Sequence, residues 1–115
     1  MNNYVLFLDD EREPSVSLLA QYERVVICRS FDDAVRVVQE LGLPEHTCFD
    51  HDLGPESKNG HDFAKWLVEW VMDDDRFEYP PHVGYSVHSQ NPIGADNIRG
   101  VIDGYHRWCI EGLKL

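Results

Sequence analysis

Basic residues are scarce in this sequence. Its 115 residues include 10 Lys and Arg against 21 Asp and Glu, which gives a formal net charge of −11 at pH 7. A field of that sign repels polyanions, so we expect no binding of long DNA or RNA along a groove. A small phosphate substrate, held by a metal ion and by backbone amides, is compatible with this charge.

Cysteine pairs with CxxC spacing and long apolar runs are missing as well. The three cysteines, Cys28, Cys48 and Cys109, show no CxxC spacing, and the first two lie in apolar runs of strand length. We expect buried free thiols in a reducing compartment. No run approaches the ~20 apolar residues of a membrane span, and no basic segment precedes the first apolar run. We therefore expect a cytoplasmic protein with no membrane contact, of unspecified oligomeric state.

The overall composition is that of one globular domain. Hydrophobic residues make up 43% of the chain and charged residues 27%, so we expect residues 1–115 to form a single domain. A chain of this length buries roughly two-thirds of its unfolded surface and needs no structural zinc or disulfide to fold. Any bound metal would therefore serve chemistry.

Apolar periodicity predicts alternating strands and helices. Short apolar runs predict strands at residues 4–8, 24–28, 47–49 and 82–88. Amphipathic spacing and capping residues predict helices at residues 15–22, 31–41, 61–73 and from 92 almost to the end. In the last helix we expect a buried face made of Ile98, Val101, Ile102, Tyr105, Trp108 and Cys109.

This order of elements predicts an α/β fold with an open, mostly parallel sheet and right-handed crossovers. In the flavodoxin-like strand order 2-1-3-4, the first and third strands are neighbours, and a site forms beyond their carboxyl ends. Asp9 and Asp10 follow the first strand, and Asp50 and Asp52 follow the third. We expect these four side chains to meet at one edge of the sheet.

Four carboxylates at one edge repel one another. A bound divalent cation or raised pKa values would relieve the repulsion. Carboxylate oxygens suit a hard ion such as Mg²⁺ better than Zn²⁺. The alternative is that these residues cap strand ends and face water. Because two acidic pairs converge, we favour a Mg²⁺ or Mn²⁺ site formed by Asp9, Asp10, Asp50 and Asp52.

Residues around the fourth strand are candidates for binding phosphate. Ser86 and His88 are two residues apart, so in an extended strand they point the same way. Ser89 and Asn91 precede the last helix, whose free backbone N–H groups favour an anion. For Asn91 the alternative is an N-cap role without any ligand.

Other polar and aromatic side chains have two interpretations each. Arg12, in the loop after the first acidic pair, could clamp a phosphate or pair with a nearby carboxylate. We expect His51 to project away from the site, although a bulge of one residue would turn it inward. His61 and Asp62 resemble the His-Asp pair of helical metal phosphohydrolases, but such enzymes need further His and Asp residues on other helices, so we assign His61 to the surface at a helix start. Trp66 and Trp70 fit the core or a partner contact better than a platform for stacking bases.

Several motifs together resemble a response-regulator receiver domain. They are Leu-Phe-Leu-Asp-Asp at residues 6–10, Phe-Asp-His-Asp-Leu-Gly at 49–54, Gly60 before a helix, and Ser86 at the end of the fourth strand. The resemblance implies that Asp9, Asp10 and Asp50 hold Mg²⁺, that Asp50 accepts a phosphoryl group and that Ser86 senses it. The Lys-Pro pair of receivers is missing, and the fifth strand and helix are absent or reduced.

A more specific resemblance comes from residues 8–12, 50–54 and 88–94. They are similar to the compact cyclic-phosphate processing receiver domains, which implies processing of cyclic phosphates on nucleotides or RNA ends. We therefore expect a metal-dependent phosphoesterase in which His88 protonates the leaving alkoxide, with Asp50 as metal ligand or nucleophile. The alternatives are an atypical receiver switch that accepts phosphate at Asp50, and a non-catalytic acidic binding module.

Overall fold

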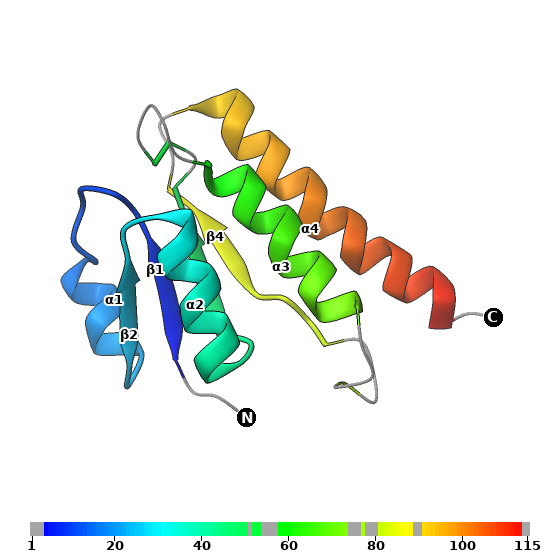
Figure 1. Ribbon diagram of the computed structural model, residues 1–115, viewed down its shortest axis with the longest axis horizontal. Helices are drawn as coiled ribbons and strands as arrows, with labels where there is room; N and C mark the ends of the chain where they lie inside the picture. The colour runs from blue at the N-terminus through cyan, green and yellow to red at the C-terminus, as the bar shows by residue number, and fades with distance from the viewer. Residues whose placement is uncertain are drawn as a thin grey trace.

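The computed structural model describes residues 4–50, 52–53, 58–73, 77, 81–88 and 91–113. Strands and helices alternate along these ranges, as the sequence predicts (Figure 1). The elements are β1 (Val5–Leu8), α1 (Val16–Gln21), β2 (Val25–Cys28), α2 (Phe31–Leu41), β3 (His46–Phe49), α3 (Gly60–Met72), β4 (Tyr85–Val87) and α4 (Pro92–Leu113).

The strands form one parallel sheet in the order β2-β1-β3-β4. This is the flavodoxin-like arrangement that the sequence predicts. In the described part of the chain β4 leads into α4, and no fifth strand follows. The carboxyl ends of the strands and the starts of α2, α3 and α4 lie at the same edge, the upper one in Figure 1.

The two faces of the sheet are covered unequally. One face packs against α2, α3 and α4 and buries large side chains such as Leu6, Leu8 and Phe49. Each such side chain stabilises the fold by roughly 1.5–3 kcal/mol. On the other face Phe7 and its neighbours pack under residues of α1 and its C-cap. Among the described helices α1 alone packs there, which agrees with the predicted loss of the fifth helix.

Side-chain caps fix the starts of two helices at the carboxyl edge. The Ser30 hydroxyl accepts the backbone N–H of Asp33 at 3.1 Å and begins α2. Asn59 and Asp62 form a capping box, in which each side chain accepts the other's backbone N–H at 2.9 Å. Both caps satisfy N–H groups that a helix start leaves unpaired. They also hold the first residues of α2 and α3 beside the strand ends.

Two local expectations are wrong. The strand expected at residues 82–88 is confined to Tyr85–Val87, because the backbone N–H of Val83 bonds to His106 Nε2 at 3.0 Å rather than to a neighbouring strand. Trp108, expected on the buried face of α4, is 55% exposed. Its neighbour Cys109 packs against the core, so the buried face of α4 continues through Tyr105 and Cys109 and leaves Trp108 beside it.

The predicted burial of Cys28 and Cys48 as free thiols is confirmed, and the reducing compartment stays a prediction. Cys28 and Cys48 are buried free thiols, and Cys109 is half-buried. Burial raises the pKa of Cys28 to about 12, so this thiol is neutral and unreactive at neutral pH. Within the described ranges, no helix combines the length and apolar character that crossing a bilayer requires.

Candidate metal and phosphate site

The parallel sheet brings three predicted side chains together. Backbone hydrogen bonds continue one residue beyond each strand: Asp9 N–H to Cys28 O at 3.0 Å, Asp50 N–H to Leu8 O at 3.0 Å, and His88 N–H to Phe49 O at 2.9 Å. Because β1, β3 and β4 are adjacent, Asp9, Asp50 and His88 sit side by side at the carboxyl edge. This is the place where open α/β sheets bind their ligands.

Three of the four expected carboxylates form a compact group. Asp9, Asp10 and Asp50 each offer one oxygen, and these oxygens lie within 4.8 Å of one another. Asp9 is buried, and the other two are half-buried. Asp52 is exposed and lies outside this group. Its backbone N–H donates to the carboxylate of Asp50, so its role as a metal ligand stays a prediction.

Three hydrogen-bond contacts hold the carboxylate of Asp9. Its Oδ1 accepts the backbone N–H groups of Glu11 at 2.9 Å and Arg12 at 2.8 Å, and its Oδ2 lies 3.0 Å from Nε2 of His88. Burial alone would raise the pKa of Asp9, but these two N–H groups and His88 outweigh burial and lower it. Asp9 is therefore ionised at neutral pH and held in one orientation.

The surroundings of Asp50, in contrast, disfavour its negative charge. Burial, the charge of Asp9 and the charge of Asp10 raise the pKa of Asp50, and His88 and the N–H of Asp52 oppose them only in part. A nearby cation stabilises a carboxylate whose negative charge is disfavoured by its other neighbours. Oxygen ligands of this kind suit Mg²⁺ or Mn²⁺. The group of three carboxylates therefore fits a hard divalent cation.

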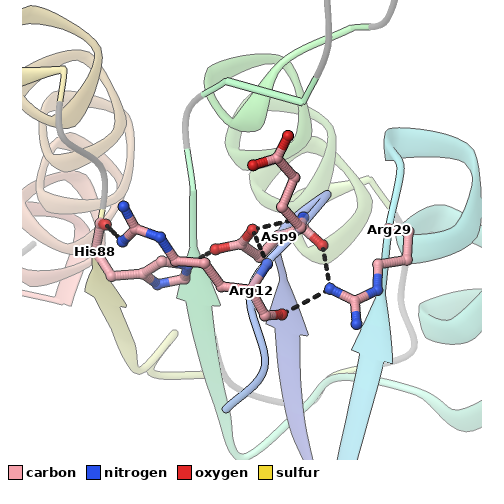
Figure 2. A network of polar contacts seen from close by, with 5 residues as sticks. Asp9, Arg12, Arg29 and His88 are labelled. Carbon is pink, nitrogen blue, oxygen red and sulfur yellow. Dashed lines mark hydrogen bonds and ion pairs between the residues drawn. The ribbon is translucent and has the colours of Figure 1, made fainter. Parts of the chain in front are cut away.

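The His88 ring is fixed by two contacts. It stacks on the Phe7 ring with centroids 4.9 Å apart and planes 4° from parallel, and its Nε2 faces Asp9 (Figure 2). Because Asp9 is ionised and can only accept, Nε2 carries the hydrogen of this bond. The side chain of His88 keeps 25% of its surface exposed.

Two arginines organise the loop between β1 and α1 (Figure 2). Arg12 donates from Nη1 to the carbonyl oxygen of His88 at 3.3 Å. Arg29 donates from Nη1 to the carbonyl oxygens of Asp9 at 3.3 Å and Arg12 at 2.6 Å, and its Nη2 pairs with Glu13. Sequence reasoning missed Arg29, although its place directly after β2 puts it at the same edge.

The structure separates Ser86 from the carboxylates. Ser86 shares a sheet face with His88, as expected, but it lies two residues further from the edge. Its hydroxyl is 3.1 Å from Nε2 of His46. Because each strand residue advances the chain by about 3.3 Å, Ser86 occupies a separate position on that face. A phosphate-binding role for Ser86 stays a prediction.

Asn91 has the capping role that we weighed for it. Its Oδ1 accepts the backbone N–H of Gly94 at 3.0 Å at the start of α4, which confirms the N-cap. Ser89 and His51 lie outside the described residues. His61 is half-buried in the first turn of α3.

Comparisons with known proteins agree with this architecture. One solved structure, described as a yeast Spc42 trimeric coiled coil of amino acids 181–211 fused to another structure, is similar with a TM-score of 0.61 and 19% identity. The match covers 88% of this chain and 63% of that one, and it shows the fold alone. No curated protein matches the sequence. Residues 4–104 match the cyclic-phosphate processing receiver domain, and the chain therefore belongs to that family.

Proposed function

We propose that this domain hydrolyses a small cyclic phosphate in a metal-dependent reaction, with a cyclic nucleotide or an RNA-end cyclic phosphate as substrate. One observation carries the proposal. The oxygens of Asp9, Asp10 and Asp50 lie within 4.8 Å of one another, and one of these carboxylates holds the imidazole of His88. The family's description supports a cyclic phosphate as the class of substrate.

The carboxylates would hold Mg²⁺ or Mn²⁺, with exposed Asp52 as a further candidate ligand. When bound, such an ion neutralises charge on phosphoryl oxygens and makes a bound water more acidic. The chain supplies the geometry for this. The backbone N–H groups that bond to Oδ1 of Asp9 fix that carboxylate. The disfavoured negative charge of Asp50 favours cation binding.

His88 is the proposed general acid. Hydrolysis of a cyclic phosphate ester forms a P–O bond to a water oxygen, whose proton passes to solvent, and breaks one P–O bond of the ring, whose departing alkoxide oxygen must gain a proton. Asp9 holds Nε2 of His88 through one hydrogen bond, and stacking on Phe7 fixes the plane of the ring. We assign the transferred proton to Nδ1, the ring nitrogen that does not face Asp9. A carboxylate that orients a catalytic imidazole in this way is a recurring arrangement.

Arg12 is the proposed phosphate clamp. Its guanidinium reaches the backbone of His88, which places a permanent positive charge beside the proposed acid. Guanidinium groups bind phosphate oxygens through several N–H donors. Arg29 holds the carbonyl oxygen of Arg12 from the opposite side. The loop is therefore fixed at both ends of Arg12.

The test is an assay of metal-stripped protein with added Mg²⁺ or Mn²⁺. The substrates are 2′,3′-cyclic nucleotides, 3′,5′-cyclic nucleotides and RNA ending in a cyclic phosphate. We expect turnover of at least one class in wild type and none in Asp50→Ala. Asp73→Asn is the matched control, because Asp73 is an exposed carboxylate at the far end of α3. Lack of metal-dependent turnover with all three classes would refute the proposal.

A parallel measurement separates the alternative of a receiver switch. The protein is incubated with a small phosphodonor and Mg²⁺, and its intact mass is recorded. A stable phosphoryl adduct that disappears in Asp50→Ala, together with no hydrolysis of cyclic phosphates, would favour the switch.

A further inference from the structure

A hollow of ≈ 260 Å³ opens between the start of α2 and the first turns of α3. Two aromatic rings and four charged side chains line it: Phe31, Trp66, Lys58, Asp62, Lys65 and Glu69. We call it the α2–α3 hollow. Trp66 is half-buried rather than enclosed, so part of its indole is available to a ligand.

The charges around the hollow are unusual for this protein. The chain has a net charge of −11 and three lysines, at positions 58, 65 and 114, and two of the three line the hollow. Lys58 Nζ lies 4.8 Å from the centroid of the Phe31 ring, and Lys65 Nζ lies 3.8 Å from a carboxylate oxygen of Asp62. The rim therefore offers ammonium donors and carboxylate acceptors around an aromatic wall.

This mixture favours a nucleobase over a bare phosphate. A phosphate would meet the carboxylates of Asp62 and Glu69 as well as the lysines, and like charges repel. A base has an aromatic face that stacks on rings, and an edge of hydrogen-bond donors and acceptors that matches both kinds of charged group. The contact of exposed Lys58 with Phe31 is weak enough for a base to replace it.

Aromatic contacts connect the hollow with the strand that carries Asp50, one of the three grouped carboxylates. The Phe31 and Trp66 rings both contact Phe63, with centroids 6.4 Å and 5.9 Å away. Phe63 in turn lies 5.9 Å from Phe49, the residue that precedes Asp50. The starts of α2 and α3 share the carboxyl edge with the strand ends (Figure 1). The hollow and the group of carboxylates therefore lie at the same edge of the sheet.

We propose that the α2–α3 hollow binds the base of the cyclic-phosphate substrate. The base lies against Phe31 and Trp66, and its polar edge meets Lys58, Lys65 and the carboxylates beside them. This inference rests on the proposed function and assigns the place where the base of its substrate binds. The preferred substrate is a nucleotide or an RNA end, rather than a cyclic phosphate without a base.

The first test compares two substrates in the presence of Mn²⁺: adenosine 2′,3′-cyclic phosphate, and glycerol 1,2-cyclic phosphate, which has no base. We expect kcat/KM to be at least about 10-fold higher for the nucleotide, the scale of one base stacked on one ring. In Trp66→Leu this ratio should fall towards one. Trp70→Leu is the matched control, because Trp70 stacks on Trp66 with centroids 6.2 Å apart but does not line the hollow. It should keep the wild-type ratio.

A second measurement follows binding without catalysis. Adenosine 3′-monophosphate is titrated into metal-free protein, and the indole N–H signals are recorded by NMR, with the Trp66 signal identified by its loss in Trp66→Leu. We expect that signal to shift and the Trp70 signal to shift less. Equal kcat/KM for the two substrates, with no shift at Trp66, would overturn the base site and leave the proposed hydrolysis standing. A shift at Trp66 together with no metal-dependent turnover of any of the three substrate classes named above would overturn the hydrolysis and support the nucleotide site.

Discussion

Substitutions of His88 should have distinct effects on the stability of the fold and on the rate of catalysis. In His88→Ala the protein loses the hydrogen bond to ionised Asp9 and the ring contact with Phe7. A hydrogen bond to a charged group contributes roughly 1.5–3 kcal/mol, and a stacked aromatic pair about 0.5–1.5 kcal/mol. Because the His88 side chain is 25% exposed, we expect a loss near the lower end, about 2–3 kcal/mol. That loss lowers Tm by about 10 °C for a domain of this size.

The same substitution should also strongly lower turnover. A lost general acid costs roughly 10²–10⁴ in rate, so His88→Ala should lower kcat by that factor well below its Tm, with Mn²⁺ affinity little changed. His88→Gln provides the sharper comparison. A Gln amide can donate to Asp9 and recover part of the stability, but it cannot transfer a proton.

Three results would contradict this account of His88. Recovery of turnover in His88→Gln would mean that His88 only orients Asp9. Recovery of His88→Ala by excess Mn²⁺ would mean that His88 is a metal ligand. His46→Ala is the control, because His46 is also half-buried on this sheet face and stacks on an aromatic ring, Tyr22, at 6.2 Å. An equal loss of turnover in that variant would show that kcat reports the packing of the sheet.

Three further variants test the electrostatics of the fold. Asp50→Asn should stabilise metal-free protein at neutral pH, because the raised pKa of Asp50 means that the folded state disfavours its charge. This gain in stability should vanish below about pH 3.9. Mn²⁺ should raise the Tm of the wild-type protein but not that of Asp50→Asn. Burial and the imidazole of His82 lower the pKa of His106, and its neutral Nε2 accepts a backbone N–H. Stability in urea should therefore fall as pH drops below about 6.5, where the unfolded chain binds the proton more readily, and His106→Gln should flatten this loss. Arg29→Gln frees the carbonyl oxygen of Asp9 and should weaken Mn²⁺ binding several-fold in a calorimetric titration, whereas unchanged affinity would show that Arg29 does not position the site.

The fold follows from local sequence patterns to a large extent. The strands β1 and β2 are apolar runs with clear limits, and each helix has a cap close to its start, such as Ser30 or Asn91. One boundary could have been placed better, because Asn59 and Asp62 have the three-residue spacing of a capping box. The limits of β4 could not be predicted, since the bond from Val83 to His106 joins residues 23 apart.

The carboxylate group was predictable for a topological reason. Parallel strands in the order 2-1-3-4 place Asp9, Asp10 and Asp50 at one edge whatever the details of packing. Which partner each side chain selects was not predictable. The contact of Ser86 with His46 and the role of Arg29 depend on the orientation of side chains from separate strands, which spacing along the sequence does not encode.

The most direct test of the central claim measures metal binding and turnover in the same samples. Metal-stripped wild type, Asp50→Asn and Asp73→Asn are titrated with Mn²⁺, while hydrolysis of a 2′,3′-cyclic nucleotide is followed at each concentration. We expect turnover in wild type and Asp73→Asn to rise in parallel with the occupancy of one Mn²⁺ site, and both signals to be lost in Asp50→Asn. Turnover that persists without Mn²⁺, or that survives the loss of the Asp50 carboxylate, would contradict the claim that this group of carboxylates is the catalytic centre.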